Sequence, residues 1–190
     1  MFGKGLQYYP ESVPQRTRDV DRARALVRES GVTTVELATG VTDPSWQAAT
    51  QLVVDQLAEV GLTVRTRTVP PETYFSDVRA NATFHFSRTG TLPVANWLAT
   101  SQLTSRVANS YSRYTDPEID RLHAAALAGP DEAARTEAIG RALTILHERV
   151  ATPVWGVSDW IVAAHADVSG LGAYRPNTYD WANFARVSLG

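Results

Sequence analysis

The feature of this sequence that most restricts its fold is a repeated alternation of strand-like and helix-like segments over its first half. Residues that alternate in polarity predict strands at 33–39, 62–69 and 83–87. Helical spacing of apolar residues predicts helices before and between these strands, at about 20–30, 45–60 and 72–80. Because successive parallel strands are joined by crossovers, usually helices, this order predicts an α/β fold with a sheet flanked by helices.

The first two predicted helices carry start and stop signals. Asp19 is suited to cap the first helix and Gly31 to end it, while Asp43-Pro44-Ser45 begins the second helix and Gly61 closes it. We expect each helix to turn one face inward: Val20, Ala23, Leu26 and Val27 in the first, and Ala49, Leu52, Val53, Gln56, Leu57 and Val60 in the second.

The second half of the chain is predicted to be mainly helical. After an irregular stretch at 88–110, which contains a short helical patch near 95–101, two helices are expected at about 116–128 and 131–149. The second of them has apolar residues at three- and four-residue spacing: Ala138, Ile139, Ala142, Leu143, Leu146 and Val150. Short strands are expected near 153–157 and 159–164, followed by a tail rich in Gly, Pro and Asn.

Three carboxylates lie within five positions at the start of the 116–128 helix: Asp116, Glu118 and Asp120. Either Thr115 caps the helix, with Glu118 completing a capping box, or Asp116 caps it, with Pro117 at the first helical position. Glu118 and Asp120 are two residues apart and therefore do not share a helix face. We interpret the cluster as a helix cap rather than a catalytic or metal-binding site.

The composition argues against several classes of function. The formal net charge is −2 and no block of Lys and Arg occurs, which disfavours nucleic acid and anionic membranes as partners. The chain has no cysteine, so it has neither a disulfide framework nor a thiolate metal site. No apolar run approaches the roughly 20 residues that a membrane-spanning helix needs.

The motifs of common catalytic sites are also missing. The four histidines are scattered without an HExxH pattern, Gly3-Lys4-Gly5 lacks the rest of a phosphate-binding loop, and no GxSxG elbow is present. We therefore expect no catalytic residue, no metal and no cofactor. An enzyme would require His123 and His147, or Asp116 and Glu118, to meet in a pocket.

The irregular stretch 88–111 is the best candidate for ligand binding, because loops held by a rigid scaffold often carry function. It offers a planar cation, hydroxyl and amide groups and aromatic rings, a mixture that suits recognition of a polar organic molecule. The candidate ligand-binding residues are Arg88, Thr89, Asn96, Trp97, Asn109 and Tyr111. The alternative is that the aromatic residues only anchor the loop and that Arg88 is solvated.

The order of these segments resembles the C-terminal half of the family 5 extracytoplasmic solute-binding proteins, the oligopeptide-, dipeptide- and nickel-type receptors of ABC importers. The resemblance is carried by RDVDRARALVRESG (18–31), DPSWQAATQLVVDQLAEVGLTVRTRTV (43–69) and TYFSDVRANATFHFS (73–87). It is strongest in YTDPEIDRLHAAALAGPDEAARTEAIGRALTILHERVATPVW (114–155), where an Asp-Pro-Glu helix start is followed by a second helix and a strand after Pro153.

This resemblance implies a periplasmic-binding-protein-like lobe of type II, with a mixed sheet flanked by helices and hinge or crossover segments at both ends. Residues 1–18 would be a hinge or linker, 19–155 the ligand-binding lobe, and 156–190 a crossover strand and tail directed towards an N-terminal lobe that the chain lacks. Trp155 and Trp160 would belong to an apolar surface facing that lobe.

The resemblance also implies a role in capture rather than catalysis. The ligand would be a peptide-like or other small polar solute, and the partners would be the transmembrane subunits of an ABC permease. The location would be extracytoplasmic, with a lipid anchor on an upstream segment. In the family, the loop that corresponds to the residues after 83–87 contributes to the ligand site.

The sequence departs from the family pattern in this loop. Peptide-binding members commonly place an acidic residue there to pair with the α-amino group of a peptide, whereas SRTGTLPVANWL (87–98) contains none. No Asp or Glu occurs between Asp77 and Asp116. Since a buried ammonium without a counter-charge is costly, Arg88 indicates instead a carboxylate or another anionic or strongly polar ligand group.

Two other functions fit the same residues. The lobe could sense a small molecule within a transcriptional regulator, or it could have lost ligand binding altogether. A DNA-binding segment or a signal sequence upstream would separate the regulator from the importer receptor.

Overall fold

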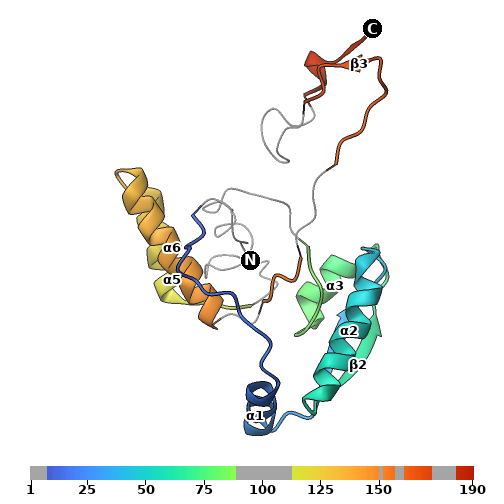
Figure 1. Cartoon of the computed structure of the whole chain (residues 1–190), viewed down its shortest axis with the longest axis vertical. Coiled ribbons are helices and arrows are strands. Elements are labelled where there is room, and N and C mark those ends of the chain that lie inside the picture. Colours follow the sequence, from blue (N-terminus) through green and yellow to red (C-terminus); the bar gives the residue numbers. More distant parts are fainter. Residues whose placement is uncertain (1–7, 89–112, 150–151, 157–160, 173–182) are drawn as a thin grey trace.

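The computed structural model describes residues 8–88, 113–149, 152–156, 161–172 and 183–190 (Figure 1). In chain order its elements are α1 (Val20–Ser30), β1 (Thr34–Thr39), α2 (Ser45–Glu59), β2 (Thr63–Thr68), α3 (Tyr74–Asn81), α5 (Pro117–Ala128), α6 (Glu132–Arg149), β3 (Val168–Ser169), the 3-10 helix η1 (Phe184–Arg186) and β4 (Ser188–Leu189). Both expected helical signals of α1 are confirmed: Asp19 accepts a hydrogen bond from the Arg22 amide, and Gly31 ends the helix with a left-handed φ of 67°.

The first half of the chain forms a parallel β–α–β unit. β1 and β2 pair in parallel from Thr34 opposite Thr63 to Thr39 opposite Thr68, and α2 makes the crossover between them. The α/β class predicted from the alternating pattern is therefore confirmed. Parallel and antiparallel strands lie in separate two-stranded sheets in the described residues, because β3 pairs only with β4.

The expected strand at 83–87 is reduced to a single bridge. His85 pairs in parallel with Ala38, and the Ala38 amide donates a 2.9 Å hydrogen bond to the Phe84 carbonyl. Ala38 is the penultimate residue of β1, so this segment meets β1 only where that strand is about to end. The pairing is too short to make a full strand, but it places residues 84–86 beside β1.

An aromatic cluster forms the core of this unit. The Trp46 ring lies 4.9 Å from Tyr74 and 5.8 Å from Phe86, measured between ring centroids. The buried Tyr74 hydroxyl donates to the Phe86 carbonyl at 2.9 Å and lies 3.2 Å from the Ala38 carbonyl. This one side chain therefore connects α3 to the ends of both neighbouring segments of the sheet.

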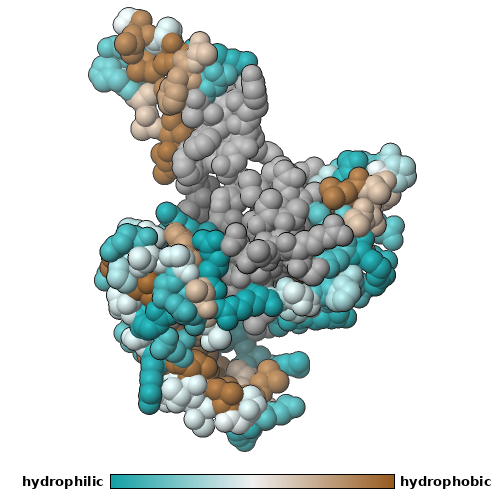
Figure 2. Space-filling view, turned by 180° about the vertical axis from the view of Figure 1, so that it is seen from behind, coloured by the Kyte–Doolittle hydropathy of each residue, from teal (hydrophilic) through white to brown (hydrophobic). Residues whose placement is uncertain are grey.

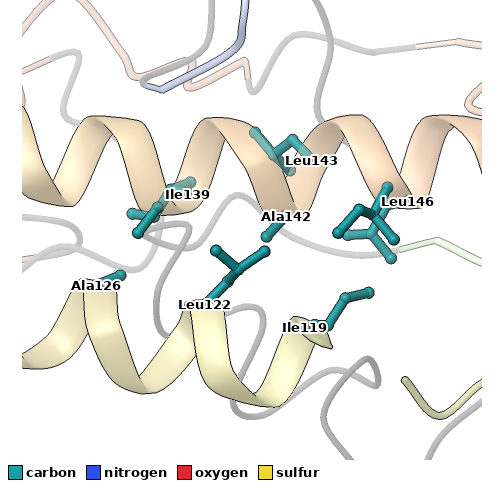
Figure 3. Packing of buried hydrophobic residues seen from close by; sticks show 9 residues of the cluster. Ile119, Leu122, Ala126, Ile139, Ala142, Leu143 and Leu146 are labelled. Carbon is teal, nitrogen blue, oxygen red and sulfur yellow. The ribbon is translucent and has the colours of Figure 1, made fainter. Parts of the chain in front are cut away.

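A second core lies between α5 and α6, which pack antiparallel (Figure 3). Ile119, Leu122 and Ala126 of α5 face α6. The inward face predicted for the 131–149 helix is confirmed, since its described members are all buried: Ala138, Ile139, Ala142, Leu143 and Leu146. The sixth member, Val150, lies outside the described residues.

The carboxylate cluster at 116–120 acts as a cap, as interpreted, and the second of the two capping patterns is the one that forms. Asp116 is the N-cap, with Pro117 at the first helical position, and it accepts a hydrogen bond from the Glu118 amide at 2.9 Å. Its other oxygen receives the Tyr114 hydroxyl at 2.8 Å and the Arg149 guanidinium at 3.0 Å. Asp116 therefore also connects the beginning of α5 to the end of α6.

Arg113 joins the two cores. Its guanidinium donates to the Arg79 carbonyl at 2.9 Å and to the Ala80 carbonyl at 2.7 Å, in the last turn of α3. The carbonyl end of a helix carries partial negative charge, so a cation is well placed there.

Two of the expected inward faces are wrong in part. No residue of α1 is buried and Leu26 is 54% exposed, because no described element packs along that helix. In α2 the buried residue is Trp46, whereas Leu52 is 59% exposed. A sheet of two strands and one bridge covers a narrower strip of α2 than the helical pattern predicts.

The strands expected near 153–157 and 159–164 are not found in the described parts of that stretch, 152–156 and 161–164. These residues are exposed, and none of the described strands pairs with them. The two short strands of the tail are instead β3 and β4. Several apolar side chains of this part of the chain are exposed: Ile161, Leu171, Phe184 and Leu189. Brown, hydrophobic surface is visible on the C-terminal end of the molecule in Figure 2.

None of the described helices is both long and apolar enough to cross a membrane.

Truncating Leu122 should destabilise the α5–α6 pair. Leu122 is 8% exposed, so Leu122→Ala should lower the free energy of unfolding by about 2–5 kcal/mol through lost burial and a residual cavity. The matched control is Leu127→Ala on the same helix, where Leu127 is 65% exposed and the change should stay within roughly 0.5 kcal/mol. Urea unfolding followed by circular dichroism measures both, and equal losses would contradict the assignment of this core.

Replacing Asp116 by Asn should leave the helix cap but remove its charge. Hydrogen bonds from the Glu118 amide and the Tyr114 hydroxyl, together with Arg149, hold the pKa of Asp116 below its usual value of 3.8. A lowered pKa stabilises the fold above pH 3.8, and this stabilisation is lost as the pH falls through the folded-state pKa. The melting temperature of the wild type should therefore exceed that of Asp116→Asn at pH 7, and the two should converge in acid.

The matched control for this pH series is Asp21→Asn, because the side chain of Asp21 is 94% exposed and its pair with Arg24 lies on the surface. Its melting curve should follow the wild type throughout. A difference between wild type and Asp116→Asn that stays constant down to pH 2 would show that the carboxylate charge plays no part.

Candidate functional site

The strongest candidate site lies where the parallel segments of the sheet end. In open α/β sheets, ligands bind outside the carboxyl ends of the strands. Here those ends are residues 40–45 after β1, Val69 after β2, and residues 86–88 after the bridge to Ala38. We call this set of residues the carboxyl edge.

Gly40 allows the chain to pack closely at this edge. A Cβ at this position would lie 2.9 Å from Cδ2 of Tyr74 and 2.9 Å from the Val69 carbonyl oxygen, closer than side-chain carbons approach other atoms. Glycine thus lets β1 end directly against the Tyr74 ring. The close packing fixes the position from which residues 41–45 begin.

Asp43 and Ser45 place polar groups on the carboxyl edge. Oδ1 of Asp43 accepts from the Ser45 amide at 3.0 Å and from the Ser45 hydroxyl at 2.6 Å. These two bonds lower the pKa of Asp43, and the nearby positive charge of Arg88 lowers it further. The carboxylate is therefore ionised at neutral pH and lies within electrostatic range of Arg88.

Thr42 contributes a hydroxyl whose hydrogen-bonding capacity the described protein does not use. Its Oγ1 is shielded from solvent and has no hydrogen-bond partner. The neighbouring hydroxyls differ, since Thr39 and Thr50 pair at 2.9 Å and Thr50 donates to the Trp46 carbonyl at 2.7 Å. A buried polar atom without a partner is uncommon, and bound groups are one reason for it.

Trp155 adds an aromatic surface to the carboxyl edge. Its ring meets Phe86 edge to face, with centroids 6.0 Å apart and an interplanar angle of 68°. Trp155 itself is 56% exposed. The aromatic stack that begins at Trp46 in the core therefore continues through Phe86 to a ring that faces solvent.

Of the six residues predicted to bind ligand, the structure describes one. Arg88 is exposed and lies at the carboxyl edge, two residues beyond the buried Phe86. The other five lie outside the described residues: Thr89, Asn96, Trp97, Asn109 and Tyr111.

The site residues predicted from the sequence did not include Thr42, Asp43 or Trp155. Asp43 had a usable signal, because it follows the strand predicted at 33–39 and so had to lie at a strand end. Trp155 was expected on the apolar surface that faces the other lobe, but its contact with Phe86, almost seventy residues away in sequence, could not be predicted.

Two hollows of about 400 and 360 Å³ lie elsewhere, between residues 8–12 and α6, with Pro10, Thr136 and Gly140 lining both. They are wide open to solvent, and neither is lined by Arg88 or its neighbours. Within the described part of the chain, no group of three His, Asp or Glu side chains is arranged to hold a metal ion.

Comparison with known proteins gives structural relatives but no curated one, since no curated protein matches the chain. The ABC transporter-associated periplasmic binding protein DppA from Helicobacter pylori, solved with the peptide STSA, matches 77% of the chain and 30% of its own length, at 17% identity and a TM-score of 0.68. HbpA2 from Haemophilus parasuis matches 96% of the chain and 38% of its own length, at 19% identity and a TM-score of 0.67.

A third structure is NikA from Staphylococcus aureus in complex with Ni(L-His)2. It matches 76% of the chain and 32% of its own length, at 15% identity and a TM-score of 0.63. At these identities the likeness concerns the fold, and it confirms the type II periplasmic-binding-protein class. The chain spans about a third of the length of these relatives.

The family model described as bacterial extracellular solute-binding proteins, family 5 Middle, matches residues 1–115. That span is more than half of the 190 residues. The chain therefore belongs to family 5 of the bacterial extracellular solute-binding proteins.

Proposed function

We propose that this chain is the ligand-binding lobe of the substrate receptor of an ABC importer and that it captures a small polar solute. The observation that carries the proposal is the carboxyl edge: in a member of this family, charged, hydroxyl and aromatic side chains converge at the end of a sheet where such folds bind ligands. The role is capture, so Arg88 and Asp43 would bind the solute and have no part in a reaction.

The proposed mechanism is closure of two lobes over the solute about a hinge, after which the closed receptor docks on the permease. In this proposal residues 1–18 are hinge or linker, residues 19–155 form the lobe, and residues 156–190 cross to the second lobe. The exposed apolar side chains of the tail, Ile161, Phe184 and Leu189 among them, would then be covered by that lobe.

The ligand is proposed to be a solute with an anionic group. Arg88 is exposed at the carboxyl edge, and a guanidinium binds carboxylates through two parallel hydrogen bonds. Two of the structural relatives were solved with the peptide STSA and with Ni(L-His)2, both of which carry carboxylates. The other residues proposed to contact the ligand are Thr89, Asn96, Trp97, Asn109 and Tyr111.

The partners and location follow from the family. The family description is extracellular, which favours an extracytoplasmic receptor working with an ABC permease over an intracellular regulator. We propose that a lipid anchor on an upstream segment holds the receptor at the membrane.

The 190-residue chain on its own should bind solutes weakly. One lobe presents half of a cleft, so a ligand keeps much of its surface in water and gains few of its contacts. Calorimetric titration of the purified chain with short peptides should give dissociation constants weaker than micromolar, or no measurable heat. Micromolar binding of a simple peptide would show that the chain forms a complete site by itself.

Removing the charge of Arg88 should impair uptake. The gene is deleted in its host, and uptake of a mixture of short peptides is followed by mass spectrometry with the gene restored as wild type or as Arg88→Gln. Loss of one charged hydrogen-bonding group should lower uptake of the transported peptides by roughly tenfold.

The matched control is Arg65→Gln, because Arg65 is an exposed arginine in the middle of β2, away from the carboxyl edge. It should restore uptake fully. Deletion that leaves uptake of every peptide unchanged would count against an importer receptor for such solutes, and equal uptake with both variants would remove Arg88 from the site.

A further inference from the structure

The proposed ligand site has a cation in Arg88, but residues 78–115 contain no acid to balance a positively charged ligand group. The acids on either side of that stretch are engaged elsewhere. Asp77 accepts from Arg67 at 2.7 Å and from Asn81 at 2.9 Å. Asp116 caps α5 and pairs with Arg149.

A carboxylate reaches the carboxyl edge from a different part of the sequence. Ala38 and His85 are paired, so the chain continues past that pair on two adjacent parallel segments, towards Asp43 on one and Arg88 on the other. Both side chains therefore lie at the same edge with opposite charges. They form no ion pair with each other in the described structure, so neither charge is neutralised by the other.

The hydrogen bonds of Asp43 leave half of its carboxylate available. Both bonds from Ser45 go to Oδ1. Oδ2 accepts no hydrogen bond from a described residue. One oxygen is thus held by Ser45, the first residue of α2, while the other accepts from no described residue, and Asp43 as a whole is only partly buried.

The surroundings of Asp43 fit a ligand as well. The adjacent Thr42 hydroxyl is buried without a partner, and a ligand group could complete its hydrogen bonding. Trp155 presents an exposed aromatic ring over Phe86 at this edge. Aromatic faces attract cations and apolar groups alike.

Building on the proposed function, we infer that Asp43 is a ligand-binding residue that pairs with a cationic group of the solute while Arg88 pairs with an anionic group. The ligand class is a small zwitterion, such as an amino-acid derivative or a short peptide with free ends. The acid that the 87–98 loop lacks is supplied from the turn between β1 and α2. Asp43 then determines specificity, because a solute without the cation would leave its charge unpaired.

The test uses four forms of one dipeptide, alanyl-phenylalanine: with both ends free, N-acetylated, C-amidated, and with both ends blocked. Each is titrated at millimolar concentration into the ¹⁵N-labelled chain, and into any longer gene product that contains it, with indole and backbone NMR shifts as the readout. The wild type should bind the free dipeptide roughly tenfold more tightly than the acetylated form.

Asp43→Asn removes the charge but keeps a side-chain oxygen that can accept the two hydrogen bonds from Ser45. This variant should lose the preference for the free amine and keep that for the free carboxylate, whereas Arg88→Gln should show the reverse. Asp55→Asn, on the exposed side of α2, is the matched control and should behave like the wild type. The unfolding midpoints of the variants establish that they are folded. The dipeptides with blocked ends test the contribution of each ligand charge on the wild type, without any variant.

Binding that ignores the amine, or a preference for the amine that persists in Asp43→Asn, would overturn the inference and leave the receptor proposal standing. If no form of the dipeptide binds at millimolar concentration to any gene product that contains this lobe together with a second one, while the spectra show a folded protein, the proposed function for peptide-like solutes fails, and the inference fails with it.

Discussion

The buried side chain of Tyr74 is the interaction on which the candidate site depends. Its ring is fully shielded from solvent, lies against Trp46 and leaves room only for a glycine at position 40. Its hydroxyl meets the carbonyls of Ala38 and Phe86, where β1 and the 84–86 segment run side by side. Burial raises the pKa of Tyr74 to about 12, so the hydroxyl stays a donor at any ordinary pH. The positions of Asp43 and Arg88 follow from this connection.

The α5–α6 pair is held by a different kind of interaction at its ends. The mutual burial of their apolar faces supplies most of the stabilisation, and a single carboxylate sets the ends in register: Asp116 bonds to the first turn of α5 and to Arg149 at the end of α6. Arg113, three residues before Asp116, reaches across to the last carbonyls of α3. Polar contacts at helix ends thus connect two cores that share no buried residue.

One physical pattern links this architecture to the proposed capture of a solute. At both Asp43 and Asp116 one carboxylate oxygen accepts a hydrogen bond from the amide two residues further on, near the start of a helix, but the second oxygen has different surroundings. At Asp116 the second oxygen accepts hydrogen bonds from Tyr114 and Arg149 within the protein. At Asp43 it accepts from no described residue and lies at the sheet edge beside Arg88. The same local motif is structural in one place and available for a ligand in the other.

The sequence by itself determined the local features of this protein: the helices, the strands β1 and β2, the cap at Asp19, a cap at Thr115 or Asp116, and the inward face of α6 all follow from short-range spacing. It also placed Arg88 in a candidate site. Tertiary structure alone decided that Leu26 and Leu52 stay exposed, that 83–87 makes only a bridge, and that Asp43 and Trp155 lie at the same edge as Arg88. Periodicity shows that a face is apolar but not which element covers it. Likewise, the sequence gives the position of a charged residue along the chain but not its neighbours in space. Those neighbours are fixed only when strands that are distant in sequence pair and reach the same edge of the sheet.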